Sequence, residues 1–555
     1  MFLSMLGLWA LCVFYFSPRL FALLIGPEFI LVKALLFVFI LIQTGFWFYI
    51  FYHVVMVSVS YAIKPRMEAV SEPTTAPGVA LLLTTCNDFQ KSAAQTHLSQ
   101  DHPNYRLFIL DDSTDPEYQQ EIDRFKADNP DKVTVIRRKD RNGFKAGNVN
   151  YGLAQIPREY GFFSVSDADT MLPPSYIKEL LPYIQPSNIA FAQAHLMTNE
   201  VQSTDFASYF SINNNVHFDR YAVTRNTYGF VMWYGHGALM RRDIYDTLGG
   251  FPEIATEDLA YSMIAREKGF YGVYCEHVIC YEEFPPTYMQ YRLRNEKWVR
   301  GTTECLLKFY PSFLKSPDVS WFEKLDVLVS AGTLLAAFPF VLFLILGGVV
   351  LPVFYHHFQF AGVMFKMPIE YGRFSLGLVE NIQSNLFWSW DLFVLLLGII
   401  FAPLVPIFID YWRKPKQILN YLNIYVFCFF SIQVVSALHF FVTLITKTAV
   451  FPVTGAKEQP VESVDTRVSA SPWYLRSHSN LAGTFGMEIA VGILFLGICL
   501  KTQNIWFLPF ITALFLSPFL FRWNLNSVYM RQAISLPLIA IIGIIYFIVQ
   551  GLFRI

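Results

Sequence analysis

Charged residues are scarce in this chain, and neither sign of charge is in excess. Asp, Glu, Lys and Arg make up 15% of the 555 residues, whereas soluble domains contain about 25%. The formal net charge is −1, so no overall basic field favours nucleic acid as a partner. The seven cysteines include no CxxC pair, which argues against a disulfide framework or a zinc site.

Hydrophobic residues, in contrast, make up 54% of the chain, and the mean hydropathy is +0.37. This composition predicts a membrane protein. Most of the charged residues nevertheless lie between Lys64 and Lys315, which predicts one soluble-looking domain inside a membrane-embedded frame. The predicted parts are N-terminal transmembrane helices (1–63), the soluble-looking domain (64–317), transmembrane and interfacial helices (318–446), a polar loop (447–482) and C-terminal transmembrane helices (483–555).

The soluble-looking part alternates short apolar runs with amphipathic stretches, which predicts an α/β domain with a parallel sheet. Ligands of such sheets bind at the carboxyl ends of the strands. The expected strands are 78–84, 105–110, 132–136, 162–166 and 189–194, and the expected helices are 88–100, 118–126, 147–155 and 174–184.

Two acidic clusters follow expected strands. Asp111 and Asp112 come directly after the second strand, where carboxylates can accept hydrogen bonds from a nucleotide; a solvated turn is the alternative. Asp167 and Asp169 follow the fourth strand. Two carboxylates at positions i and i+2 can converge on one Mg²⁺ or Mn²⁺ ion, which typically bridges such groups to substrate phosphates.

A third acidic cluster, Thr256-Glu257-Asp258, follows a Gly-Gly-Phe-Pro turn. Thr256 is expected to cap a helix that runs from Asp258 towards Lys268, and a carboxylate there could act as a general base.

The stretch Arg294-Asn295-Glu296-Lys297-Trp298 begins a basic segment that also includes Arg300. Its Trp can stack on a sugar, and its cations can neutralise a diphosphate leaving group. A basic amphipathic helix on anionic lipid is the alternative, and both can hold.

The order of these motifs, Asp-Asp, DxD, TED and a basic motif ending in Trp, resembles the membrane-integrated, processive family 2 glycosyltransferases. Cellulose, curdlan and hyaluronan synthases belong to this group, and the spacing looks most like that of the bacterial osmoregulated periplasmic glucan synthase. The resemblance implies a GT-A type α/β nucleotide-sugar transferase domain inserted in a membrane domain of about seven spanning helices plus interfacial helices.

The resemblance also implies roles for individual residues. Asp258 would be the catalytic base, and Asp167 and Asp169 would hold the metal, Mg²⁺ or Mn²⁺. Nucleotide-sugar binding would fall to Thr84, Asp111, Asp112, Lys145, Asp167, Arg294 and Lys297. Acceptor binding would fall to Trp298, Glu257, Tyr234 and His236.

The sequence departs from the family pattern in the Trp motif. The usual QxxRW has Arg294 in place of Gln and Lys297 in place of Arg. Because Lys lacks the bidentate fork of Arg, this departure implies a different arrangement of diphosphate binding.

The polar loop contains Phe451, Val453, Thr454 and Lys457 in an arrangement that resembles the FxVTxK gating loop of cellulose synthases, with one extra residue before the Lys. That loop is cytosolic in the family. The resemblance therefore implies that the preceding apolar run, Leu419 to Leu444, lies along the interface; the residues alone leave open that it spans the membrane.

The predicted function is a processive inverting hexosyltransferase that polymerises a UDP-sugar, with UDP-glucose favoured by the resemblance, into a β-linked polysaccharide and exports it. A non-processive transferase that adds one sugar to a lipid carrier is the first alternative, and a transporter with a non-catalytic domain is the second. The expected partners are the UDP-sugar, the growing polysaccharide and the lipid bilayer, with accessory export subunits left open. Basic residues at several helix ends favour a multi-pass protein of the plasma (inner) membrane whose catalytic domain faces the cytoplasm.

Overall fold

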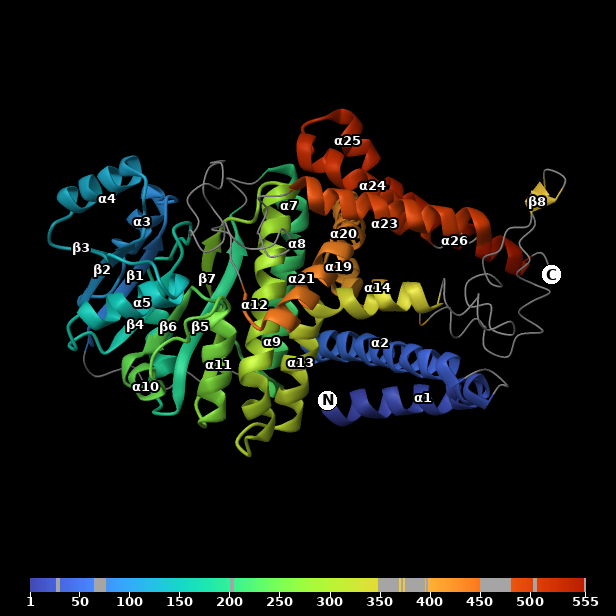
Figure 1. Cartoon of the computed structure of the whole chain (residues 1–555). Coiled ribbons are helices and arrows are strands. Elements are labelled where there is room, and N and C mark those ends of the chain that lie inside the picture. Colours follow the sequence, from blue (N-terminus) through green and yellow to red (C-terminus); the bar gives the residue numbers. More distant parts are fainter. Residues whose placement is uncertain are drawn as a thin grey trace.

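An α/β domain lies at one end of the molecule, and a bundle of long helices extends from it (Figure 1). The computed structural model describes residues 1–25, 30–63, 76–199, 204–347, 369–370, 373–374, 395, 398–449, 481–502 and 507–553.

The α/β domain is built on a seven-stranded sheet in the order β3-β2-β1-β4-β6-β5-β7. The strands are β1 (Val79–Thr85), β2 (Tyr105–Asp111), β3 (Val133–Arg137), β4 (Phe162–Ser166), β5 (Ile189–Thr198), β6 (Ala238–Arg241) and β7 (Tyr271–Glu282). Strand β6 runs antiparallel to both of its neighbours, whereas the other pairs are parallel. The prediction of a parallel sheet was therefore wrong, because it missed the antiparallel strand β6; strand β7, which is parallel to β5, was also missed.

Helices cover both faces of the sheet, because successive strand residues point to opposite sides. On one face, β1 residues such as Leu81 pack with α3 (Lys91–His97), α4 (Pro116–Asp128) and α6 (Tyr176–Leu180), which is followed by the short helix η1 (Leu181–Ile184). On the other face, residues such as Leu82 pack with α5 (Phe144–Gln155), α10 (Arg242–Leu248) and α11 (Glu257–Glu267).

Short helices lead from the sheet towards the bundle. These are α7 (Asp205–Phe210), α8 (Ile212–Val216), the π-helical segment η3 (His217–Ala222) and α9 (Val223–Tyr228). The 28-residue helix α12 (Tyr288–Lys315) follows β7 and lies between the sheet and the bundle (Figure 1).

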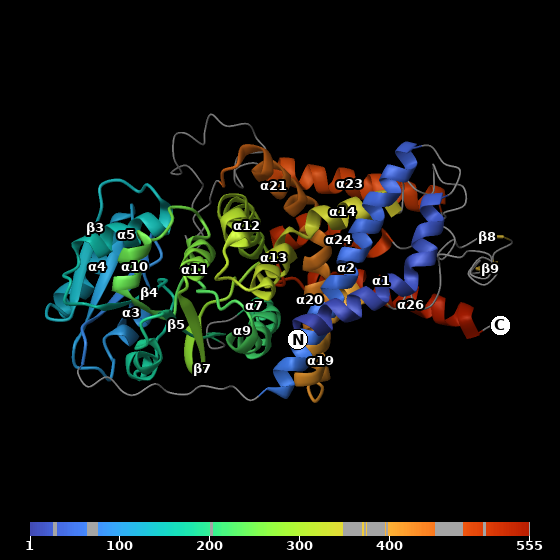
Figure 2. The same cartoon turned by 90° about the horizontal axis from the view of Figure 1, so that it is seen from below.

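The bundle begins with the antiparallel pair α1 (Phe2–Ile25) and α2 (Ile30–Ala62), whose N-terminal end lies on the side of the α/β domain (Figures 1 and 2). The later elements are α13 (Trp321–Leu335), α14 (Ala337–Ile345), the hairpin β8–β9 (Ile369–Glu370, Arg373–Phe374), η5 (Ala402–Leu404), α19 (Val405–Asp410), α20 (Pro415–Ser431), α21 (Gln433–Thr446), α23 (Leu481–Thr502), α24 (Leu508–Trp523), α25 (Val528–Ala533) and α26 (Leu536–Phe553).

Two helices within the described residues are long and apolar enough to cross a membrane, Ile30–Ala62 and Val528–Tyr546. The number rises to four if each of two bent pairs is one span, α13 with α14 and α20 with α21. This count is lower than the seven spans implied by the sequence, so that number stays a prediction. The run Leu419 to Leu444 is bent by 44° between α20 and α21, and its orientation in a membrane also stays a prediction.

Polar contacts attach α12 firmly to the bundle. The Arg292 guanidinium lies 2.6 Å from a carboxylate oxygen of Glu488 on α23, and both side chains are buried. The Tyr288 hydroxyl donates to Ser431 on α20 at 2.9 Å and lies 3.0 Å from Ser517 on α24. The helix that carries the basic Trp motif is therefore fixed against three helices of the bundle.

Candidate active site

The carboxyl ends of β1, β2 and β4 bring predicted site residues from three strands to one edge of the sheet. In register, Thr85 on β1 faces Asp111 on β2, and Leu83 faces Ser166 on β4. The Thr84 hydroxyl donates to the Ser166 carbonyl at 3.1 Å. The predicted nucleotide-side and metal-side motifs therefore share this edge.

Asp111 and Asp112 are adjacent in sequence but have different surroundings. Asp111 is 2% exposed, and its carboxylate accepts hydrogen bonds from Arg137 at 2.6 Å and from the Ser113 amide at 2.8 Å. Asp112 accepts two hydrogen bonds from Arg138, at 2.9 and 2.7 Å. Asp111 therefore stabilises the end of strand β2. Asp112 and Arg138 form the ion pair at the rim of the site.

Lys145 lies between the donor-side carboxylates and the loop that follows α9. Its ammonium contacts Asp167 and donates to the Gly235 carbonyl at 2.9 Å. Although burial acts against it, the Lys145 charge lowers the pKa of Asp167 below its usual range. Asp167 is therefore ionised at neutral pH, with a cation already beside it.

Asp169 is in the opposite situation. Burial, followed by the charges of Asp167 and Glu282, raises its pKa to about 7. Its carboxylate accepts a hydrogen bond of 3.0 Å from the Glu283 amide. The His236 charge offsets this rise only in part, and a divalent cation would supply the remaining positive charge.

The two carboxylates fit the chemistry of Mg²⁺ or Mn²⁺, since both ions prefer oxygen ligands. Asp167 and Asp169 stand two residues apart after β4 and repel each other electrostatically. No group of three or more His, Cys, Asp or Glu side chains in the described part of the chain is arranged to hold a metal, so further ligands would come from substrate phosphates and water.

The predicted base lies across Lys145 from the metal motif. Burial raises the pKa of Asp258 above its usual value, and burial together with the Asp258 charge raises that of Glu257 to about 7. Gly235, at φ +86°, comes so close that an added Cβ would lie 3.4 Å from the Asp258 carboxylate and 3.8 Å from the Lys145 nitrogen. Lys145 therefore connects the two acidic motifs.

Thr256 occupies the N-cap position of α11, as predicted, but its side chain makes no capping hydrogen bond. Its hydroxyl donates instead to the Gly301 carbonyl of α12 at 2.9 Å. This contact fixes the start of α11 against α12, so the TED motif and the Trp motif form one unit.

The first Arg of the Trp motif is held between two aromatic rings. The Arg294 guanidinium lies 4.0 Å from the centroid of Phe284 and 4.5 Å from that of Trp298. Burial lowers its pKa to about 10, against the charges of Glu282 and Asp169. Trp298 is 38% exposed, so this aromatic clamp leaves part of the indole open.

The two other cations of this segment differ in position. Lys297 acts electrostatically on Asp167, Glu257 and Asp258. Arg300 is 1% exposed and lies 3.0 Å from Glu296 and 2.9 Å from His439. The expectation that Arg300 faces a diphosphate was therefore wrong, because its charge is used in holding α12 against α21.

Comparison with known proteins shows what this domain is similar to. Residues 77–301 match the family model described as "Glycosyltransferase like family 2". They form a family 2-type glycosyltransferase domain.

Two curated relatives of this domain are plant proteins. Glucomannan 4-beta-mannosyltransferase 1 of Oryza sativa subsp. japonica is 25% identical over 236 residues, which are 41% of this chain and 45% of the relative. Glucomannan 4-beta-mannosyltransferase 7 of Arabidopsis thaliana is 24% identical over 256 residues, 43% and 45% of the two chains. The match thus spans less than half the length of these relatives.

A solved structure of mannosyltransferase PcManGT from Pyrobaculum calidifontis, in complex with GDP-Man and Mn²⁺, is also similar. It is 14% identical, with a TM-score of 0.46, and the match covers 68% of this chain and 99% of that one.

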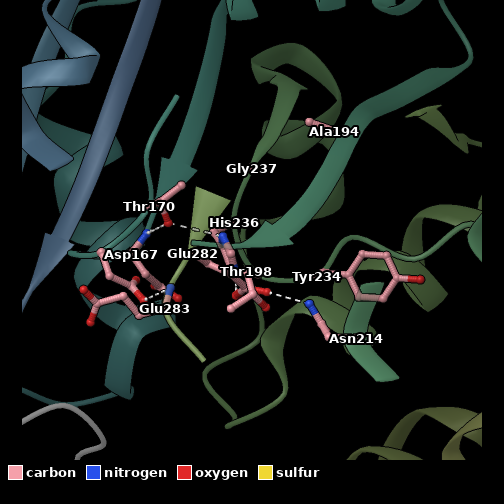
Figure 3. Close-up of polar contacts among 12 residues, drawn as sticks. Asp167, Thr170, Ala194, Thr198, Asn214, Tyr234, His236, Gly237, Glu282 and Glu283 are labelled. Carbon is pink, nitrogen blue, oxygen red and sulfur yellow. Dashed lines mark hydrogen bonds and ion pairs between the residues drawn. The ribbon is translucent and has the colours of Figure 1, made fainter. Parts of the chain in front are cut away.

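The two predicted acceptor residues, Tyr234 and His236, have different surroundings. His236 is buried, and its ring nitrogens lie 3.2 Å from Glu282 and 3.3 Å from Thr170. The Tyr234 hydroxyl lies 3.0 Å from His217. In Figure 3 the Tyr234 ring points away from His236 and Asp167. His236 thus lies beside the metal motif of Asp167 and Asp169.

Sequence reasoning missed Arg138, Gln193 and the pairing of Glu282 with His236. Arg138 stands in a basic run directly after β3, which was a usable signal. Gln193 gave none: it is a buried residue in β5 that donates to the carbonyls of His236 and Gly237 at 3.1 Å and accepts from the Tyr234 amide at 3.1 Å.

The gating-loop candidates Phe451, Val453, Thr454 and Lys457 lie outside the described residues. The chain that precedes them is described. Ala449 packs against Ala255, next to the TED motif, and its amide donates to Glu304 at 3.2 Å. The polypeptide therefore reaches residue 449 beside the candidate base.

Proposed function

We propose that this protein is a membrane-integrated, inverting hexosyltransferase that extends a β-linked polysaccharide from a nucleotide sugar. One observation supports this above all others. Lys145 contacts Asp167 and Gly235, and Gly235 adjoins Asp258, so the donor-side carboxylates and the base surround one cation.

Each side chain has a role in the proposed single displacement. Asp258 accepts the proton of the acceptor hydroxyl, which attacks the anomeric carbon from the face opposite the leaving nucleotide. Arg294 and Lys297 neutralise the departing diphosphate. Asp167 and Asp169 would hold the divalent cation, which supplies Lewis-acid stabilisation of the same leaving group. One displacement inverts the configuration, so an α-linked donor gives a β-linked product.

Experiment must decide which nucleotide and which sugar make up the donor. The resemblance in sequence favours UDP-glucose, whereas the plant relatives are named as mannosyltransferases. Asp112 with Arg138 is the pair we assign to the nucleotide base, with Thr84 and Lys145 beside the phosphates. Trp298, and Glu257 beside Asp258, are assigned to the acceptor.

The membrane helices support polymer export as the companion role. A hydrophilic glycan cannot cross hydrocarbon unaided, and α12, which carries the Trp motif, contacts α20, α23 and α24 through Tyr288 and Arg292. We propose that residues 451–457 close over the bound nucleotide, since the chain enters this segment beside Ala255. The proposed location is the plasma (inner) membrane, with the glycosyltransferase domain in the cytoplasm.

The test uses the purified full chain in detergent, supplied with radiolabelled UDP-glucose or GDP-mannose and with Mn²⁺ or Mg²⁺. Release of nucleoside diphosphate and the length and linkage of the product are measured, with Asp258→Asn as the control. Long β-linked products that need Asp258 are expected. Single additions to lipid would support the lipid-carrier transferase instead, and no metal-dependent turnover of any nucleotide sugar would overturn the proposal.

A further inference from the structure

Two arginines, five residues apart, join the glycosyltransferase domain to the membrane helix α2. Arg220, in η3, pairs through two hydrogen bonds, at 2.9 and 2.7 Å, with Asp410 of α19, which also accepts 2.7 Å from the Tyr61 hydroxyl of α2. We call this group the outer tether. Arg225, in α9, makes a second connection of the same kind deeper in the protein.

In this inner tether, Arg225 contacts both carboxylate oxygens of Asp326 of α13 at 3.1 Å. The Tyr52 hydroxyl of α2 donates to Asp326 at 2.5 Å and accepts from Arg225 at 2.9 Å. Tyr52 is 1% and Asp326 0% exposed. Removing one partner from a buried charge network leaves another partner unsatisfied, so the inner tether is sensitive to single changes.

The inner tether also fixes the chain that follows α9. The Phe230 amide donates to Asp326 at 3.2 Å. Gly229 lies so close that an added Cβ would be 2.9 Å from an Asp326 oxygen. Burial raises the pKa of the Tyr234 phenol, and the Arg225 charge acts against this rise. The carboxylate of α13 and the arginine of α9 thus hold the start of the segment that leads from Gly229 to Tyr234.

Tyr234 is the first residue of the loop Tyr234–Gly237. This loop separates the Asp167/Asp169 motif from the Glu257/Asp258 motif. Gln193 holds this loop from the sheet side through Tyr234, His236 and Gly237. Gly235, between them, adjoins Asp258 and accepts from Lys145. A shift of Tyr234 would therefore change the position of Gly235 relative to the candidate base.

We propose that the inner tether Tyr52–Arg225–Asp326 is a positioning device through which α2 sets the loop Tyr234–Gly237 for acceptor attack. The proposal rests on the proposed function for its catalytic consequence. Tyr52, Arg225 and Asp326 are positioning residues, since they act through Tyr234 and Gly235. The outer tether has the same chemistry but contacts no residue of this loop in the described contacts, so it is a matched control.

The test compares Tyr52→Phe with Tyr61→Phe in the full chain. Each substitution removes one hydroxyl from α2 and leaves the ring. We expect Tyr52→Phe to lower the kcat for transfer about tenfold, the loss typical of one charge-assisted hydrogen bond, and to raise the ratio of donor hydrolysis to transfer. The donor KM is expected to stay unchanged, and Tyr61→Phe is expected to leave all three quantities at wild-type values.

Hydrogen exchange of the peptide 231–237 gives a readout that does not depend on turnover. Exchange should be faster in Tyr52→Phe and unchanged in Tyr61→Phe. Gly229→Ala, whose added Cβ would lie 2.9 Å from an Asp326 oxygen and disturb the inner tether from the loop side, should give the same faster exchange, and it provides the test if Tyr52→Phe does not fold.

Equal exchange and equal hydrolysis-to-transfer ratios in the Tyr52 and Tyr61 variants would overturn the proposed role of the inner tether. A wild-type protein without turnover of any nucleotide sugar would overturn the proposed function instead. The exchange comparison would then still decide whether α2 holds the loop.

Discussion

The Arg138 guanidinium covers the Asp112 carboxylate with two hydrogen bonds of 2.9 and 2.7 Å. Arg138 also donates to the carbonyls of Asn142 and Phe144, at 2.5 and 3.0 Å. Asp112 is therefore held in place by the segment between β3 and α5.

This pairing predicts that Arg138→Ala weakens nucleoside diphosphate binding about 10- to 100-fold, because a carboxylate loses a bidentate charge-assisted partner. Calorimetry with UDP and GDP on the purified chain measures the affinity. Arg137→Ala is the control: Arg137 pairs with the buried Asp111, so it should lower the melting temperature and spare the affinity. The idea fails if the two variants lose affinity equally.

The first five strands could be predicted from sequence because each is a short apolar run followed by turn residues. β1, β2, β3 and β4 begin and end within one residue of the expected positions. Strand β6 could not be predicted, because its four residues, Ala238 to Arg241, are too few to show the alternation of a strand. Strand β7 was missed because polar residues interrupt it, and its pairing with β5 shifts register between Ala194 and His195.

The candidate site likewise has features that the sequence predicts and features that it does not. Positions after strands were predictable, since they depend only on where each strand ends, and Asp112, Asp167 and Asp169 all lie at one sheet edge. Side-chain partners were not, since they depend on register: Asp111 faces Arg137 across β2 and β3, and this alignment brings the next residues, Asp112 and Arg138, together.

Glu257 and Asp258 should make transfer depend on pH. Burial and the Asp258 charge raise the pKa of Glu257 to about 7, and burial raises that of Asp258 as well. The base must be ionised to accept a proton, so kcat/KM should rise with pH as Asp258 ionises, at a pH above the usual range of an aspartate. Glu257→Gln removes the neighbouring charge and should move this rise to lower pH.

Asp169 would titrate in the same range, since its pKa is also about 7. A pH profile at several Mn²⁺ concentrations distinguishes the two groups. A rise due to Asp169 moves to lower pH as Mn²⁺ increases, because metal competes with the proton, whereas the rise due to the acidic pair does not move. A profile in Glu257→Gln identical to wild type at saturating Mn²⁺ would contradict the assignment to Glu257 and Asp258.

The aromatic clamp around Arg294 predicts a compensating pair of substitutions. The Arg294 Nε is buried and has no hydrogen-bond partner among the described residues, so the guanidinium is available to a diphosphate. Arg294→Gln should weaken UDP or GDP inhibition about tenfold, the scale of one lost charge-assisted contact. Adding Lys297→Arg should recover part of the loss, since Arg binds phosphate bidentately where Lys does not.

Inhibition constants of the single and double variants are the measurement. Arg300→Lys is a control for helix α12, because Arg300 pairs with Glu296 and His439. It should change thermal stability without changing inhibition. If Lys297→Arg gives no recovery in the Arg294→Gln background, the cations of the Trp motif do not share the diphosphate.

The contact between Gly301 and Thr256 predicts a rescue experiment on the joint between the TED and Trp motifs. A Cβ added at Gly301 would lie 2.7 Å from the Thr256 methyl carbon, so Gly301→Ala should push α12 away from α11. The expected cost is about 1–3 kcal/mol of unfolding free energy, as for other overpacked cores, together with a fall in kcat. Thr256→Ser removes only the clashing methyl and keeps the hydroxyl that donates to the Gly301 carbonyl. The double variant Gly301→Ala with Thr256→Ser should therefore regain stability and turnover, as thermal denaturation and initial rates would reveal. Rescue of stability without rescue of turnover would mean that the joint supports the fold but does not set the position of Asp258.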